Sequence, residues 1–214
     1  MGAKTWMLVY ASGDPRVALR NTPSLDVEAS IRLATSLFPR ERLEEIGRGD
    51  LSYTCPPNNE IHVGHFGDVA VVAAKEFGID YPSRLRQRFL AQAPFPDAYL
   101  HAMHSVVDWF AFAQWKSGTL IRSLSVSPDD GVMENLGSAL SFEEPYWSGE
   151  RPAVDPEDDP DSYPLSFHPL EFGEAALRAM FGYQLEGEID PSLLEPESIE
   201  LLTLKRSRRL WKFF

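Results

Sequence analysis

The sequence predicts a single α+β domain, with a mainly antiparallel or mixed sheet and helices packed on it. The 214 residues suit one large domain, and hydrophobic residues make up 43% of them, which is enough to bury a core. Three strand-like segments follow one another closely, at 97–104, 107–115 and 119–126. Strict alternation of strands and helices is absent, and this argues against a doubly wound nucleotide-binding fold.

The N-terminal part is predicted to begin with a buried strand at 4–10, KTWMLVY. Asp14 and Pro15 have the residue types of a helix N-cap and a first helical position, so a short helix should follow. A longer helix is predicted at 26–38, because apolar residues recur there at helical spacing and a proline follows. Its apolar stripe consists of Val27, Ile31, Ala34 and Leu37. The charged residues 40–48 are expected to continue in helical form.

The remaining elements are predicted from the same two periodicities. In order, they are strands at 60–66 and 69–77, a helix at 83–93, the three strands named above, a helix at 170–182 and a final strand at 199–204. The clearest hairpin joins 107–115 to 119–126 through a tight turn, because both runs alternate and are rich in aromatic residues. Residues 155–161, DPEDDPD, are predicted to form a solvated loop.

The formal net charge of −12 is unevenly distributed along the chain. Residues 1–126 carry 13 acidic and 13 basic side chains, residues 127–204 carry 19 acidic and 2 basic, and residues 205–214 carry 5 basic and no acidic. We therefore divide the chain into one domain, 1–204, and a basic aromatic tail, 205–214. The part of the domain at 127–197 is acidic and rich in loops.

This charge favours a basic protein or a cationic small ligand as partner, and it disfavours nucleic acid and anionic membrane surfaces. No apolar run approaches the roughly 18 residues that span a membrane. The single cysteine, Cys55, forms no intramolecular disulfide. We therefore expect a cytoplasmic location. Neither Gly-x-Gly-x-x-Gly nor Gly-Lys-Ser/Thr occurs, so no cofactor is expected, and nothing indicates an oligomeric state.

Four of the five histidines form two His-x-x-His pairs, His62 with His65 and His101 with His104. Imidazole is a common metal ligand, so the spacing invites a metal site. However, both pairs lie on predicted strands, where residues three apart point to opposite faces. A metal site would need one histidine from each pair, and hydrogen-bonded structural histidines are the favoured interpretation.

A candidate catalytic cluster consists of His101, His104, Asp108 and Arg122. Acid–base chemistry would use a histidine oriented by Asp108. Asp108 begins an apolar strand and needs a partner, for which Arg122 on the paired strand is a candidate. The structural alternative is a strand-start cap or a buried ion pair. Cys55 lies in a proline-rich loop without an identifiable base, which is typical of an idle thiol.

Four segments carry a resemblance to a known family: MGAKTW at the start, YLHAMHSVVDWFAF at 99–112, SPDDGVMENLG at 127–137 and FHPLEFGEAALRAMFG at 167–182. Together they resemble an uncharacterised actinobacterial protein family, classed as a domain of unknown function. The resemblance spans most of the chain and implies no activity. The tail after Leu204 lies outside it.

Two functions are consistent with these patterns. The favoured hypothesis is a non-catalytic binding or protein-interaction module that uses an acidic face, since no catalytic motif is found and the acidic charge is concentrated in one part of the chain. The alternative is a small-molecule enzyme with the His, Asp and Arg cluster on its central strands. Convergence of those four side chains on one cavity would favour the enzyme.

Overall fold

The computed structural model describes the chain except for residues 1, 22, 156, 158–161, 189 and 209–214. Most of the predicted acidic loop and the last residues of the predicted tail therefore lie outside the described residues. Within the described residues, no helix is both long and apolar enough to cross a membrane.

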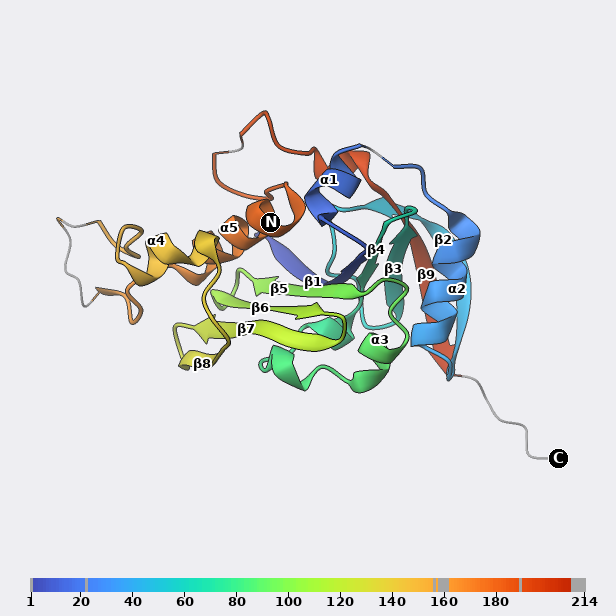
Figure 1. Ribbon diagram of the computed structural model, residues 1–214, viewed down its shortest axis with the longest axis horizontal. Coiled ribbons are helices and arrows are strands. Elements are labelled where there is room, and N and C mark those ends of the chain that lie inside the picture. Colours follow the sequence, from blue (N-terminus) through green and yellow to red (C-terminus); the bar gives the residue numbers. More distant parts are fainter. Residues whose placement is uncertain (1, 22, 156, 158–161, 189, 209–214) are drawn as a thin grey trace.

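The described residues form one sheet of nine strands, in which every adjacent pair of strands is antiparallel (Figure 1). The spatial order is β2-β9-β3-β4-β1-β5-β6-β7-β8. The strands are β1 (Lys4–Ala11), β2 (Glu41–Asp50), β3 (Glu60–His65), β4 (Val69–Ala73), β5 (Asp97–His104), β6 (Trp109–Lys116), β7 (Thr119–Ser127), β8 (Gly131–Leu136) and β9 (Glu200–Arg208). Of the two predicted alternatives, a mainly antiparallel or a mixed sheet, the structure has the antiparallel one, and because strands dominate, the α+β class describes the fold only loosely.

The helices are few and mostly short. They are α1 (Pro15–Arg20), α2 (Val27–Leu37), α3 (Gln87–Ala91), α4 (Glu144–Trp147) and α5 (Pro169–Phe181), with 3₁₀ turns η1 (Lys75–Phe77), η2 (Pro82–Arg84), η3 (Ser141–Glu143) and η5 (Pro196–Ser198). Asp14 and Asp26 accept backbone N–H groups at the starts of α1 and α2, as N-cap residues do. α5 begins after His168, and Gly182 ends it in the left-handed conformation at φ 79°.

Two apolar cores lie on opposite faces of the sheet. The strand β1 contributes to both, because its side chains alternate between Met7 and Val9 on one face and Leu8 and Tyr10 on the other. α5 and α1 cover the first face, while α2 and α3 cover the second. β1 is buried from Met7 to Ala11 and forms the centre of a three-layer arrangement (Figure 1).

Some predicted elements were wrong, and the reasons are tertiary. Residues 40–48 were expected to be helical, but 41–48 belong to β2, an edge strand that pairs with β9. Charged side chains are common on edge strands because one side of the strand faces solvent, so composition did not reveal it. β8 was not predicted, and the helix expected at 83–93 is divided between η2 and α3. β9 extends through Arg208, so Lys205–Arg208 belong to the sheet.

Candidate functional site

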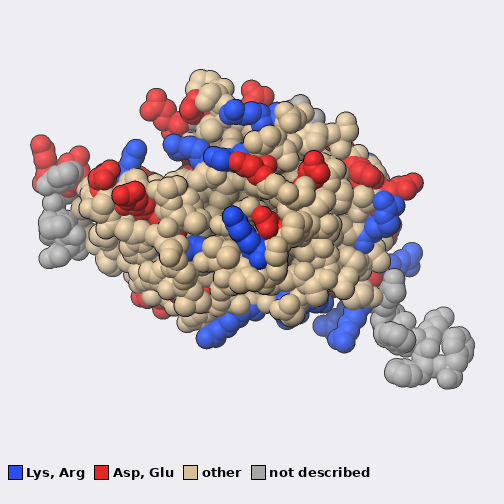
Figure 2. All heavy atoms as spheres, in the orientation of Figure 1, with Lys and Arg blue, Asp and Glu red and all other residues tan. Residues whose placement is uncertain are grey.

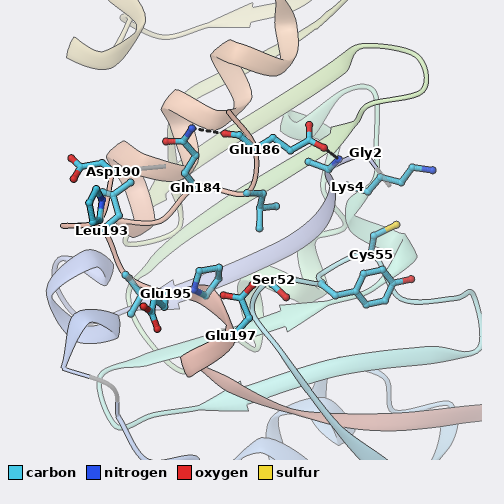
Figure 3. Close-up of a pocket in the computed structure, with 16 residues that line it drawn as sticks. Gly2, Lys4, Ser52, Cys55, Gln184, Glu186, Asp190, Leu193, Glu195 and Glu197 are labelled. Carbon is cyan, nitrogen blue, oxygen red and sulfur yellow. Dashed lines mark hydrogen bonds between the residues drawn. The ribbon is translucent and has the colours of Figure 1, made fainter. Parts of the chain in front are cut away.

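The first of two large cavities, with a volume of about 650 Å³, lies where three distant segments meet (Figure 3). Its walls come from the start of β1, from the chain that follows β2 and from the loop between α5 and β9. The lining residues are Gly2–Lys4, Ser52, Tyr53, Cys55, Gln184–Glu186, Asp190, Pro191 and Leu193–Glu197. A cavity of this size is within the range of small-molecule and peptide side-chain sites.

Backbone contacts hold these segments together. The Ala3 amide donates to the Glu186 carboxylate at 2.7 Å, which attaches the loop to the start of β1. The Trp6 amide donates to the Thr54 carbonyl at 2.8 Å, and the Leu194 amide donates to the Gly182 carbonyl at 2.9 Å. The cavity wall is therefore anchored at the β1 strand and at the end of α5.

The first cavity is predominantly acidic. Among the described residues that line it are four with carboxylates, Glu186, Asp190, Glu195 and Glu197, and one with a cationic side chain, Lys4. Glu195 and Glu197 are exposed, and no hydrogen bond or ion pair within the described part of the chain engages their carboxylates. Figure 3 shows the four acids distributed around the cavity rather than gathered at one point.

Cys55 contributes the one thiol among the described residues that line this cavity. It is a free, buried cysteine, and burial raises the pKa of its thiol, while the nearby Lys4 acts in the opposite direction. A thiol with a raised pKa is mostly protonated at neutral pH and reacts slowly. The structure therefore gives no activation of Cys55 as a nucleophile.

The second cavity also has a volume of about 650 Å³, and it shares Gln184 and Glu186 with the first. One stripe of α5 forms its floor, with Glu171, Glu174 and Arg178 in the lining. Phe142, Pro145, Tyr146, Arg151, His168, Leu170, Ala175, Gly187 and Glu188 complete the lining. The segment that contains Gln184 and Glu186 therefore separates two adjacent cavities.

Glu174 is the most unusual ionisable group of the second cavity. It is 7% exposed, and its Oε2 accepts the Leu185 amide at 2.8 Å. Its Oε1 is buried without a hydrogen-bond partner among the described residues. Burial raises the pKa of Glu174 to about 7, although the backbone amides of Leu185 and Glu186 act in the opposite direction. Sequence patterns did not indicate Glu174, because it lies within an ordinary amphipathic helix.

A protein-family model matches residues 5–203, which include nearly all of the strands and helices described above. The chain belongs to DUF6928, a family of unknown function. The resemblance inferred from the sequence is thereby confirmed at the level of a family without an assigned activity. No curated protein and no solved structure matches the chain. The part matched to DUF6928 includes α5 and the loop that lines both cavities.

The four residues of the predicted catalytic cluster do not converge in this DUF6928 chain. His101 is fully buried on the α5 face of the sheet, where its Nε2–H donates to the Gly173 carbonyl at 3.0 Å and its Nδ1 accepts the Thr5 hydroxyl at 2.7 Å. Burial lowers the pKa of His101 to about 4, so the ring is neutral. His104 lies on the opposite face, stacked with Trp6.

α5 reaches His101 closely because residue 173 is a glycine. A Cβ at that position would lie 2.6 Å from Met103 Sδ, which is too close for a non-bonded contact. The missing side chain thus allows the helix carbonyl to accept from the imidazole. His101 is therefore a structural, hydrogen-bonded histidine. It is not among the residues that line either of the two large cavities.

Asp108 and Arg122 do not pair with each other, and each has other partners. Arg122 is 1% exposed and forms a bidentate ion pair with Glu143, with Nε–Oε1 at 2.8 Å and Nη2–Oε2 at 2.6 Å. Asp108 instead faces His168, with Oδ2–Nε2 at 3.7 Å, and accepts the Tyr163 hydroxyl at 3.4 Å. The predicted Asp108–Arg122 pairing was therefore wrong.

The partner that Asp108 does have is the fifth histidine, His168, which sequence analysis left aside. The residue caps α5, since its Nδ1 accepts the Leu170 amide at 3.3 Å, and its ring lines the second cavity. Both ring nitrogens are thus directed at other groups of the protein. The pairing of residues 108 and 168 has no local sequence signal, and only Pro169, a typical first helical residue, hints at the cap.

His62 and His101, which come from different His-x-x-His pairs, cannot share a metal ion, because the strand register keeps them apart. They lie in one cross-strand row, with Ala73 and Met7 between them. Three strand spacings separate them by roughly 14 Å, which no single ion bridges. Among the described residues, no group of three or more His, Cys, Asp or Glu side chains is placed to hold a metal ion.

Proposed function

We propose that this protein is a non-catalytic binding module whose acidic first cavity accepts a basic segment of another protein. The observation that carries the proposal is the combination of a cavity of about 650 Å³ with four lining carboxylates and one lysine. A concave acidic site attracts cations more strongly than a flat surface does, because its low-dielectric walls concentrate the electrostatic field.

The distribution of the acids favours a protein segment over a small cation. Figure 3 shows Glu186, Asp190, Glu195 and Glu197 at separate places around the cavity. Several lysine or arginine side chains along one segment match such a distribution, whereas a single point charge contacts one or two of the acids.

In this proposal the binding surface is the first cavity and not the broad acidic face expected from the charge distribution. On the face of the molecule shown in Figure 2, acidic and basic side chains are interspersed. The uneven charge along the sequence therefore does not produce a uniformly acidic surface on this face, and the proposal rests on the cavity. A cytoplasmic location remains a prediction, as does the alternative small-molecule enzyme; the separate positions of His101, His104, Asp108 and Arg122 supply no shared cavity for it.

The single cysteine provides a direct test, because Cys55 lines the cavity. The rate of Cys55 alkylation by iodoacetamide is measured with and without a lysine- and arginine-rich peptide, and with an acidic peptide of the same length. We expect the basic peptide alone to slow alkylation, and we expect the protection to disappear at high salt, because exposed charges are screened there.

A matched pair of double variants completes the test. Glu195→Gln with Glu197→Gln removes two carboxylates of the cavity, and Glu44→Gln with Asp129→Asn makes the same net-charge change at exposed positions outside the cavity lining. The first pair should abolish protection and the second should retain it. Equal protection in both double variants, or none in the unmodified protein, overturns the proposal.

A further inference from the structure

The second cavity contains a feature that the proposed protein-binding role does not use. Glu174 Oε1 is buried and unpartnered among the described residues, although buried polar atoms are nearly always hydrogen-bonded. The other oxygen of the same carboxyl is satisfied by the Leu185 amide. Glu174 lines the cavity, and a buried acceptor without a partner in a lining residue is one that a ligand's donor can complete.

The charges around Glu174 favour a positively charged donor. The lining holds four carboxylic groups, on Glu171, Glu174, Glu186 and Glu188, and two guanidinium groups, on Arg151 and Arg178. Arg178 is exposed, and its Nη2 donates to Gln184 Oε1 at 2.9 Å, so this group is already directed toward the loop. No ion pair within the described residues neutralises Glu174.

An apolar wall stands beside this acidic group. Phe142, Tyr146 and Leu170 line the same cavity, and the Tyr146 ring is stacked on Phe172 with centroids 4.4 Å apart. The Tyr146 hydroxyl donates to the Glu171 carbonyl at 2.9 Å, which fixes the ring in place. A rigid aromatic surface next to a carboxyl is suited to a molecule with a hydrocarbon body and one cationic end.

We propose that the second cavity is a binding site for a small primary amine, whose ammonium group donates to Glu174 Oε1 while its hydrocarbon part lies against Phe142, Tyr146 and Leu170. This site is distinct from the acidic first cavity, and the inference does not rest on the protein-binding role. The ammonium supplies the hydrogen bond and the charge that the buried carboxylate lacks.

The site couples amine binding to loss of a proton. With its pKa near 7, Glu174 is partly protonated at neutral pH, and only the carboxylate form accepts the ammonium. Binding therefore breaks the carboxyl O–H bond and releases that proton to solvent, while the amine remains charged. The ionisable groups around Glu174 are Tyr183, His168, Glu171, Arg178, Glu186, Glu188 and Arg151.

The experiment titrates butylamine into the full chain and follows amide resonances by NMR, with butanol and butyrate as matched controls. We expect butylamine alone to shift the Leu185 amide resonance, because that amide contacts the Glu174 carboxyl. The affinity should rise by about tenfold between pH 6 and pH 8, as deprotonation of a group with a pKa of about 7 requires.

Two single variants define the role of the buried oxygen. Glu174→Gln should weaken butylamine binding by about tenfold or more and remove its pH dependence, because loss of an ion pair of this kind costs at least 1.4 kcal/mol. Glu44→Gln, the same change at an exposed position outside the cavity lining, should bind like the unmodified protein. A thermal melt of each variant verifies that it is folded.

The outcomes are separable from those of the first cavity. The double variant Glu195→Gln with Glu197→Gln should retain butylamine binding, so failure of one proposal leaves the other intact. Equal butylamine affinity in the Glu174→Gln variant and the unmodified protein overturns the amine site. So does an unmodified protein whose resonances do not respond to butylamine.

Discussion

Glu143 and Glu174 are both buried carboxyl groups on the same face of the sheet, yet their surroundings differ. Glu143 accepts from the Arg122 guanidinium, from the Leu140 amide at 2.7 Å and from the Trp147 indole at 3.1 Å. Glu174 accepts the Leu185 amide at 2.8 Å through one oxygen, and its other oxygen is buried without a hydrogen-bond partner among the described residues.

The comparison shows how burial alone fails to distinguish structure from function. A carboxylate whose oxygens are all engaged is a structural connection; here it attaches the segment that contains η3 and α4 to the strand β7. A buried carboxyl oxygen without a hydrogen-bond partner costs stability. The predictions below test this distinction.

The largest effect is expected from Glu143→Gln, which leaves the Arg122 charge buried without its anion. We expect the free energy of unfolding to fall by about 3–5 kcal/mol, as for other broken buried ion pairs. Urea unfolding followed by tryptophan fluorescence measures the loss. Glu144→Gln, at the exposed neighbouring position, is the control and should change stability little. A loss for Glu143→Gln as small as that of the control would contradict the structural role.

At high pH, Glu174→Gln should raise stability relative to the unmodified protein, whereas Glu143→Gln lowers it. The pKa of Glu174 is about 7 in the folded protein against 4.5 for an ordinary glutamate, so the folded state binds the proton more tightly. Stability of the unmodified protein therefore falls by an amount on the order of 3 kcal/mol as pH rises from 4.5 to 7, and this penalty persists above pH 7. The variant lacks the penalty, and its urea midpoint relative to the unmodified protein should rise across that window. A constant difference would contradict the raised pKa.

His101 should make stability depend on pH in the opposite direction, over nearly the same pH range. Its pKa is about 4 when folded and 6.5 when unfolded, so the unfolded state takes up the proton first. Stability is lost as pH falls from 6.5 to 4, by an amount on the order of 3 kcal/mol. A His101→Gln variant is less stable at neutral pH but should lack this acid-dependent loss. Equal pH slopes in the variant and the unmodified protein, measured by urea unfolding, would refute the assignment.

The smallest effect concerns Asp108, which holds a positive φ of 46° in the turn between β5 and β6. Asparagine tolerates this left-handed conformation and alanine does not, so Asp108→Ala should cost about 1 kcal/mol more than Asp108→Asn. Thermal unfolding of the two variants measures the difference. If Asn and Ala are equivalent, the backbone conformation of this turn is not what residue 108 provides.

Much of the fold followed from local patterns. The strand at 4–10, the hairpin of β6 and β7 and the helix α5 were predicted because their periodicity and end signals are strong. β2 was predicted incorrectly, because its charged residues are compatible with a helix until β9 pairs with it. β9 itself begins close to the predicted position and continues farther.

The candidate sites were much less predictable. The first cavity joins residues 2–4, 52–55 and 184–197, which no spacing rule relates. The predicted histidine cluster failed because residues 101 and 104 lie on opposite sides of a strand, as alternation on a strand requires. Glu174 had no sequence signal at all, since an acidic residue is expected on any surface helix.

The sequence by itself determined a mainly antiparallel or mixed sheet, the family, the concentration of acidic residues after Ser127 and the single cysteine. These properties depend on composition and on periodicity over a few residues. Only the tertiary structure decided which buried carboxyl oxygens have hydrogen-bond donors and which lack them. That choice depends on which donors the fold brings within about 3 Å of each carboxyl oxygen, and those donors come from distant segments of the chain.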